Sequence, residues 1–540
     1  MVVNIEDEFF VIDSDNLDEA QSRLYGYAVE KTGIYGGGKH DFAGVNFGGS
    51  GCYVNVQADE KSICIDQDFV GCYGLYLYES GKYFAISNSF FKLVEYLGSR
   101  CSLHVNHDYV LGLICADLCS LAYEETAINE IKLIDRNSSV HIDKPSRRLL
   151  IRRKDILINS IALDSSRALE TLDSWHDKWC HILKGISDTS NNFVVKLSGG
   201  FDSRITFMLA RNAGIDFLRA QIYSIKGTNP VHQDDYRIAS NIVDACGAEL
   251  NRPLASAGRS NLSADESVKI ALYVKQLSHK KMYLQTFRHL RCRFQLHGSG
   301  GELLRSYWDM DLQSLCNKNR KIGSREFNDG AAVDAFMRII RRSAESIAHR
   351  YGVNIDDGRL TQLIYRETRC RNHFGKSFLE NYFGNNLNLA PLLDPALHQL
   401  ALTSSACSDK NLLVALILVR YGEDLLSFGF EGGRSIANET LAVARSISKQ
   451  KPFLQRELTR EPFVNTQEPC SSSLMSSLTL ADVDRYLQEF VKNSNVISDM
   501  GEEIFAWGMR GIGDPGFSSM KRWHVLAGLM HLLELTRRSE

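Results

Sequence analysis

A chain of 540 residues is longer than a single hydrophobic core usually supports, so we expect at least two domains. Its 44% hydrophobic and 24% charged residues are typical of an ordinary globular protein. A formal net charge of −3 at pH 7 argues against a general nucleic-acid-binding protein.

The cysteines and the first residues indicate the compartment. The thirteen cysteines are an odd number and include no Cys-x-x-Cys pair, which is unlike a disulfide framework. Residues 1–8 contain no cationic segment and no long apolar run, so no signal peptide is expected. The longest apolar run, residues 412–419, is too short to span a bilayer. We therefore expect a cytoplasmic protein with reduced thiols that binds neither membranes nor nucleic acids.

Residues 1–150 have the pattern of a β-rich domain. Short alternating or aromatic runs at 53–56, 62–65 and 75–78 are separated by glycine-rich turns. A helical pattern follows within residues 150–190, around Leu169, Trp175 and Trp179.

Beyond residue 190, strands and helices alternate. Apolar runs at 193–195 and 220–224 read as strands, and each is followed by residues spaced like one face of a helix. This order predicts a parallel sheet with a ligand site at the carboxyl ends of its strands. From about residue 330 the chain is expected to be mostly helical, ending in an amphipathic helix at about 519–535. The fold class is therefore α/β with two domains, 1–150 and 151–540.

The stretch Leu197-Ser198-Gly199-Gly200-Phe201-Asp202-Ser203 joins the first of these strands to its helix. Such a turn presents backbone N–H groups to a phosphate, and glycines let the anion come close. The serine hydroxyls can donate hydrogen bonds, and Asp202 can hold magnesium. The alternative is an ordinary surface turn.

This loop resembles the Ser-Gly-Gly-x-Asp-Ser loop of the N-type ATP pyrophosphatases. The resemblance implies cleavage of ATP to AMP and pyrophosphate with adenylation of a carboxylate or carbonyl oxygen. Several families share the loop, so it does not identify the substrate.

A second small-residue bend, His297-Gly298-Ser299-Gly300-Gly301-Glu302, follows another strand end. Four small residues and an acid predict a second anion and metal loop beside the first, the alternative being a simple glycine turn. His297 is either an acid–base group or, more commonly for such a histidine, structural.

Together the two loops resemble those of the asparagine synthetase superfamily, which includes β-lactam synthetases and lasso-peptide cyclases. The turn at 66–71, the strand at 84–89 and the stretch 125–142 are similar to the N-terminal domain of asparagine synthetase. The resemblance implies an N-terminal Ntn-hydrolase-like β-rich sandwich that is a degenerate glutamine amidotransferase domain. It also implies a C-terminal ATP pyrophosphatase domain, similar to the adenine nucleotide α-hydrolases, with a helical C-terminal part.

The resemblance assigns roles to particular residues. Asp202 and Glu302 would hold Mg²⁺, Ser299 would contact the substrate, and Glu302 with Lys451 or Lys449 would be catalytic. Lys451 is slightly preferred, and a plain surface lysine is the alternative for both. Residues 391–394 would shape the substrate side of the cleft. The expected ATP contacts are Leu197, Ser198, Gly199, Gly200, Asp202, Ser203, Ser224, Gly298, Gly300 and Gly301, with adenine near Gln221 to Ser224.

Departures from the family pattern also matter. Val2 and Val3 stand where the glutaminase has its nucleophilic cysteine, so we expect glutamine hydrolysis to be lost. The first cysteine, Cys52, is expected to be a buried structural thiol. Ser299 stands where asparagine synthetase has a substrate-contacting Glu, which counts against aspartate as the substrate.

Two charged groups have open interpretations. Asp234 and Asp235 are expected to open a helix and favour its dipole, with a role in positioning ATP or metal as the lesser alternative. A basic run reads as a solvated helix face, of which one or two members could hold a carboxylate or pyrophosphate. Its members are Lys280, Lys281, Arg288, Arg291 and Arg293.

These patterns predict an ATP- and Mg²⁺-dependent carbon–nitrogen ligase without its own glutaminase. Its substrates would be a small-molecule or peptide carboxylate and an amine or ammonia, and a homodimer is left open. The alternatives are asparagine synthesis from ammonia and a non-catalytic scaffold that retains the fold.

Overall fold

The computed structural model describes residues 5–36, 47–154, 161–254, 258–280, 287–305, 307–326, 330–404, 410–453 and 463–465, together with 525, 528, 529, 531, 532, 535 and 536. Statements about the structure refer to these residues. In this described part no helix is long and apolar enough to cross a membrane.

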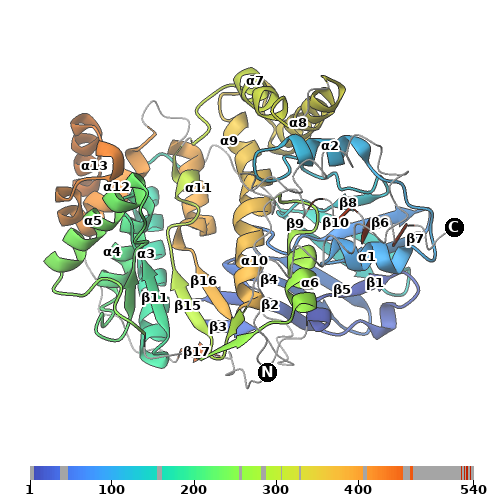
Figure 1. Cartoon of the computed structure of the whole chain (residues 1–540), viewed down its shortest axis with the longest axis horizontal. Coiled ribbons are helices and arrows are strands. Elements are labelled where there is room, and N and C mark those ends of the chain that lie inside the picture. The colour runs from blue at the N-terminus through green and yellow to red at the C-terminus, as the bar shows by residue number, and fades with distance from the viewer. Residues whose placement is uncertain are drawn as a thin grey trace.

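Two sheets dominate the N-terminal part of the chain (Figure 1), and their pairs are antiparallel except that β17 (Val464–Asn465) pairs with β3 (Gly33–Gly36) in parallel. The ring of Phe10, beside the first sheet, lies 5.1 Å from that of Tyr25 in the second, so apolar side chains fill the space between them. The β-rich prediction is therefore confirmed. The first sheet has the order β1 (Val11–Asp13), β7 (Tyr83–Ser87), β6 (Tyr76–Ser80) and β8 (Ile131–Leu133). The second has the order β10 (Arg148–Arg153), β9 (Ser138–Asp143), β5 (Ser62–Gln67), β4 (Gly51–Ala58), β2 (Arg23–Glu30), β3 (Gly33–Gly36) and β17 (Val464–Asn465).

A four-stranded parallel sheet forms the centre of the remaining chain, as the sequence predicts. Its order is β12 (Gln221–Tyr223), β11 (Phe193–Lys196), β15 (Arg293–Leu296) and β16 (Asn386–Leu389). A small antiparallel ribbon of β13 (Arg259–Asn261) and β14 (Phe287–His289) accompanies it.

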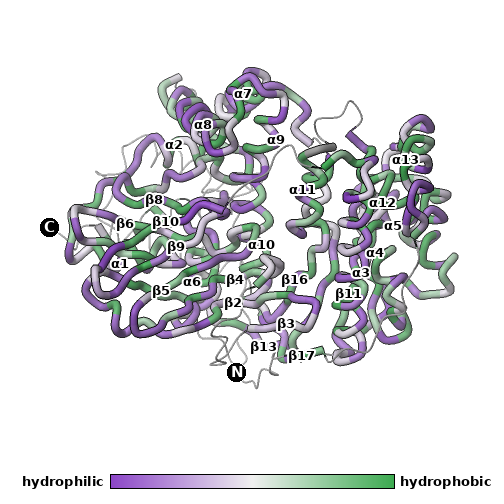
Figure 2. The backbone as a smooth tube through the Cα atoms, turned by 180° about the vertical axis from the view of Figure 1, so that it is seen from behind, coloured by the Kyte–Doolittle hydropathy of each residue, from purple (hydrophilic) through white to green (hydrophobic). Residues whose placement is uncertain are grey.

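Helices surround both halves. The predicted helix over 150–190 is α3 (Ser166–Thr189), which packs beside α4 (Phe201–Asn212). In Figure 2 the outer helices α7 and α8 carry many hydrophilic residues. The other α-helices are α1 (Phe90–Leu97), α2 (His107–Cys115), α5 (Pro230–Ala245), α6 (Ala264–Lys275), α7 (Leu312–Gly323), α8 (Gly330–Tyr351), α9 (Leu360–Ile364), α10 (Lys376–Phe383), α11 (Pro395–Ser404), α12 (Leu412–Gly422) and α13 (Asn438–Gln450). A π-helical segment, η4 (Tyr365–Gly375), links α9 to α10, and short turns are η1 (Ile5–Glu8), η2 (Leu17–Glu19), η3 (Gly301–Leu304), η5 (Pro391–Leu393), η6 (Glu423–Ser427) and η7 (Glu431–Gly433).

One local prediction, that of the basic run as a solvated helix face, is wrong. The basic run is not a helix face, because Arg288 lies in β14 and Arg293 in β15. Lys280 is buried and donates to the carbonyl oxygens of Ile114 and Ala116, and Lys281 lies outside the described residues.

The two halves share one continuous buried apolar cluster. The predicted boundary at residue 150 falls inside β10. Near the C-terminus, Val525 and Leu529 are helical and buried in the same cluster, within the stretch where an amphipathic helix is expected.

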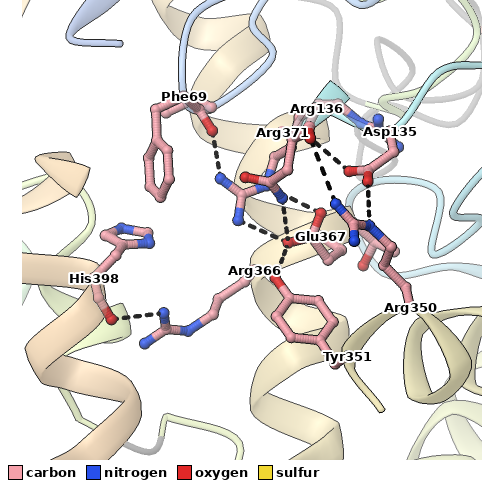
Figure 3. Close-up of polar contacts among 12 residues, drawn as sticks. Phe69, Asp135, Arg136, Arg350, Tyr351, Arg366, Glu367, Arg371 and His398 are labelled. Atoms are coloured by element: carbon pink, nitrogen blue, oxygen red, sulfur yellow. Dashed lines mark hydrogen bonds and ion pairs between the residues drawn. The ribbon is translucent and has the colours of Figure 1, made fainter. Parts of the chain in front are cut away.

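A buried polar cluster joins the halves (Figure 3). The carboxylate of Glu367, on η4, accepts hydrogen bonds from Arg136 Nη2 at 2.7 Å and Nε at 3.0 Å. The hydroxyl of Tyr351 donates to the same carboxylate at 2.6 Å. Arg350 donates to Asp135 at 2.7 Å. Every charge in this buried polar cluster therefore has an opposite charge or a hydrogen-bond partner, as a buried charge requires.

Glu367→Gln should destabilise the fold strongly, because it leaves the buried Arg136 guanidinium without its counter-charge. We expect a loss of about 3–5 kcal/mol in the free energy of unfolding. Asp334→Asn breaks the exposed Arg320–Asp334 pair and should cost no more than about 1 kcal/mol. Chemical denaturation of the two variants measures the difference, and equal losses would contradict it.

Candidate functional site

The first glycine loop has the predicted form of a strand, a tight turn and a helix. β11 ends at Lys196 and α4 begins at Phe201. Ser203 Oγ accepts from the Ser198 N–H at 3.0 Å, and Ser198 Oγ accepts from the Gly200 N–H at 3.2 Å. The Leu197 N–H donates to the Tyr223 carbonyl at 2.9 Å. The serines thus hold the turn in shape, in place of pointing outward as donors.

The start of α4 is open to an anion. Gly200 is its N-cap residue and supplies no side-chain cap. A Cβ atom at Gly200 would meet only Ser198 Oγ, at 3.4 Å. The first N–H groups of a helix have no partner within the helix, and the helix dipole favours negative charge there. This end of α4 can therefore receive a phosphate oxygen.

Asp235 supports this loop, which corrects the prediction made for it. α5 begins at Pro230, so Asp234 and Asp235 lie past its first turn and do not open the helix. Asp235 Oδ1 accepts from the Gly199 N–H at 2.7 Å, and Asp234 Oδ2 accepts from the Gly432 N–H at 2.9 Å. Both acids hold loops in place.

The second bend lies directly against the first. A Cβ atom at Gly298 would come within 2.6 Å of the Asp202 carbonyl carbon and the Ser203 nitrogen. A Cβ atom at Gly301 would overlap with the carboxyl carbon of Asp202. Glycine is required at both positions because the backbone of one bend packs on the side chain and backbone of the other. The two bends therefore meet, as the sequence predicts.

The contact brings the carboxyl groups of Asp202 and Glu302 together. Asp202 Oδ1 and Glu302 Oε2 are buried and accept no hydrogen bond from the described residues. Burial, and secondarily the charge of Asp202, raises the pKa of Glu302. Burial raises the pKa of Asp202 although the Arg305 guanidinium opposes this. Two adjacent acids with unused buried oxygens are suited to hold a cation.

A helix segment braces the second bend from behind. Gln362, on α9, donates to the Arg305 carbonyl at 3.1 Å. Arg366, on η4, donates to the Leu303 carbonyl at 3.0 Å. Leu393 of the predicted substrate-side stretch contacts Gly300, whose φ of 92° suits glycine. The bend is thus fixed before any ligand binds.

The residues fit magnesium with a nucleotide, and not an all-protein metal cage. The structure describes no group of three or more His, Cys, Asp or Glu side chains that could hold a metal ion. Magnesium is commonly held by one or two carboxylates together with phosphate oxygens and water. Asp202 Oδ1 and Glu302 Oε2 provide two such hard ligands.

Ser299 and His297 form a pair beside the site. Ser299 Oγ lies 2.7 Å from His297 Nδ1. Burial, and then the charge of Lys196, lowers the pKa of His297 to about 4, so this imidazole is neutral at pH 7. The histidine therefore orients the serine hydroxyl that we expect to contact the substrate.

Ser224, a predicted adenine contact, is already hydrogen-bonded to Asn251 through its backbone. The Ser224 N–H donates to Asn251 Oδ1 at 2.9 Å, and Asn251 Nδ2 donates to the Ser224 carbonyl at 2.9 Å. Asn251 thus occupies the two main-chain groups through which Ser224 could have bound adenine. Ser224 Oγ is buried and has no partner among the described residues.

The predicted lysines lie on the surface. Lys451 Nζ pairs with Glu170 at 2.9 Å, and Lys449 is exposed in the last turn of α13. No described interaction joins either lysine to the two acids. Among the described residues, the cation that donates to one of these acids is Arg305, which donates to Asp202 Oδ2 at 2.8 Å. The sequence analysis did not identify Arg305, and the signal that could have done so is its position three residues after Glu302.

A search of protein-family models found no match to this chain, and no curated protein matches it.

Gly301→Ala should destabilise the site, because the added methyl group overlaps with Asp202. We expect a loss of about 1–3 kcal/mol in the free energy of unfolding. The control is Gly358→Ala, where a Cβ atom meets nothing within 4 Å. Chemical denaturation of both variants measures the difference, and equal stability of Gly301→Ala and Gly358→Ala would contradict the packing.

Glu302→Gln should stabilise the ligand-free protein at neutral pH. A carboxyl group with a raised pKa favours the folded state at low pH, and this contribution is lost as the pH rises through the raised value. The variant should therefore melt at a higher temperature than the wild type at pH 7.5, with the gap closing near about pH 4.5. Thermal unfolding across pH measures this, and a pH-independent gap would contradict it.

Proposed function

We propose that the protein is an ATP-dependent carbon–nitrogen ligase that activates a carboxylate by adenylation, releases AMP and pyrophosphate, and joins the acyl group to an amine or ammonia. The observation that carries the proposal is the contact of the two glycine bends, which places Asp202 against Gly298 and Gly301. The loop resemblance supplies the reaction class. A fold similar to the Ntn hydrolases and the adenine nucleotide α-hydrolases belongs to the same proposal.

Each group at the bends has a task in such a reaction. The open N-terminus of α4 binds a phosphate oxygen, and Asp235 holds Gly199 so that the turn keeps its shape. Magnesium bound by Asp202 and Glu302 would neutralise phosphate charge. Ser299, oriented by His297, contacts the carboxylate substrate. Arg305 keeps Asp202 in place.

The nitrogen donor is ammonia or a substrate amine. Cys52 is fully buried on β4, as expected for a structural thiol, and burial raises its pKa. A buried protonated thiol is a poor nucleophile. Val2 and Val3 lie outside the described residues, so the loss of glutaminase activity stays part of the proposal.

The proposal is tested by exchange of labelled pyrophosphate into ATP in the presence of a panel of carboxylic acids. Wild-type protein should catalyse exchange with at least one acid, and Asp202→Ala should lose it by about 100-fold or more, because the phosphate charge is no longer neutralised. Asp188→Ala changes an exposed acid at the end of α3 and should leave the rate unchanged.

A wild-type protein that is inert with every acid would overturn adenylation and favour the scaffold alternative. Equal rates in Asp202→Ala and Asp188→Ala would show that exchange occurs elsewhere.

A further inference from the structure

One face of the parallel sheet is polar where such sheets are usually apolar. Side chains on one face alternate along each strand, and neighbouring strands align in register. Lys196 on β11, Gln221 on β12, Arg293 and Gln295 on β15, and Asn386 on β16 all lie on the same face. A parallel sheet normally buries both faces against apolar side chains. Polar residues on four adjacent strands therefore need a different explanation from packing.

This face forms the wall of a cavity of about 620 Å³. The ribbon of β13 and β14 contributes Arg259 and His289, and α10 contributes Asn381. Gln221, Arg293 and Asn386 are the first residues of their strands, so the cavity extends toward the opposite end of the sheet from the glycine bends. The cavity is large enough for a small metabolite.

The charges around the cavity are not balanced. Lys196, Arg259 and Arg293 line it, and no Asp or Glu is among its described lining residues. Burial and the neighbouring Arg293 lower the pKa of Lys196, and burial and Arg259 lower the pKa of Arg293. The pKa of His289 falls to about 4 through burial and the same two arginines. Like charges in a partly buried space are unfavourable unless an anion neutralises them.

Polar atoms in the wall also lack partners. Arg293 Nε, His289 Nδ1 and Asn192 Oδ1 are buried and have no hydrogen bond within the described residues. Lys196 has no ion pair there either. Buried polar atoms normally find a partner, and Arg293, His289 and Asn192 all line this cavity, so three of its lining side chains carry an atom that the described residues leave unsatisfied.

We propose that this cavity binds a small phosphorylated, hydroxyl-rich metabolite. Lys196, Arg259 and Arg293 hold the phosphate group, and the amide side chain of Asn381, which also lines the cavity, binds a hydroxyl group. The amides of Gln221 and Asn386 are already hydrogen-bonded within the wall and keep its shape. Arginine and lysine are the usual phosphate ligands, and amides both donate and accept hydrogen bonds. The cavity extends toward the other end of the sheet from the glycine bends, and its test does not depend on the proposed ligase activity.

Isothermal titration calorimetry without ATP tests this, with glucose 6-phosphate, glucose and inorganic phosphate as probes. Glucose 6-phosphate should bind at least tenfold more tightly than glucose. Arg293→Gln and Lys196→Met should each weaken that binding by at least tenfold. Arg320→Gln, which removes one exposed positive charge on α7, should bind as the wild type does.

Thermal unfolding provides a second readout. Without ligand, Lys196→Met should raise the melting temperature by about 1–3 °C, because one unbalanced charge is removed. Glucose 6-phosphate should raise the melting temperature of the wild type and leave that of Lys196→Met unchanged.

Several results would overturn the proposal. They are no binding of glucose 6-phosphate, binding of inorganic phosphate alone, cavity variants that bind normally, or equal loss of binding in Arg320→Gln. Because none of these measurements uses ATP, a failure here differs from a failure of pyrophosphate exchange.

Discussion

The candidate site depends on the packing of Gly298 and Gly301 against Asp202. A Cβ atom at either glycine would overlap with Asp202 or Ser203, so close backbone packing holds the two bends together. This packing removes water from two carboxyl groups and leaves a buried oxygen of each without a donor. The braces from Gln362 and Arg366 then prevent the second bend from relaxing away. The desolvation of these carboxyl groups is already present before any ligand binds, as in preorganised sites.

Buried charges in this protein are of two kinds, those with partners and those without enough partners. In the buried polar cluster around Glu367 each charge has a counter-charge or a hydrogen-bond partner, and this cluster stabilises the fold. At the bends acids gather, and on the polar sheet face bases gather, without enough partners among the described residues. The stability given up at these two places is consistent with ligand binding, because selection for folding alone would pair or remove the charges.

Local patterns predicted much of the architecture. Hydrophobic spacing located α3, the strands β11 and β12 and the β-rich N-terminal part, and small residues located both bends. The features that the sequence did not predict depend on contacts between distant segments of the chain. A run of basic residues gave no sign that Arg293 would be a strand residue facing a cavity, since its neighbours come from three other strands. The pairings of Asp235 with Gly199 and of Asn251 with Ser224 likewise join separate loops that no periodicity connects.

The last strand has a consequence for synthesis of the chain. Val464 and Asn465 form β17, which pairs with Gly33 and Ile34 and covers the outer edge of the seven-stranded sheet. The ribosome must therefore add several hundred residues after β3 before its edge partner exists, which takes tens of seconds at about 5–20 residues per second. During that interval the nascent sheet offers unpaired backbone groups to neighbouring chains. Rapid capture by chaperones, or slow release until translation ends, would keep such polypeptides from aggregating.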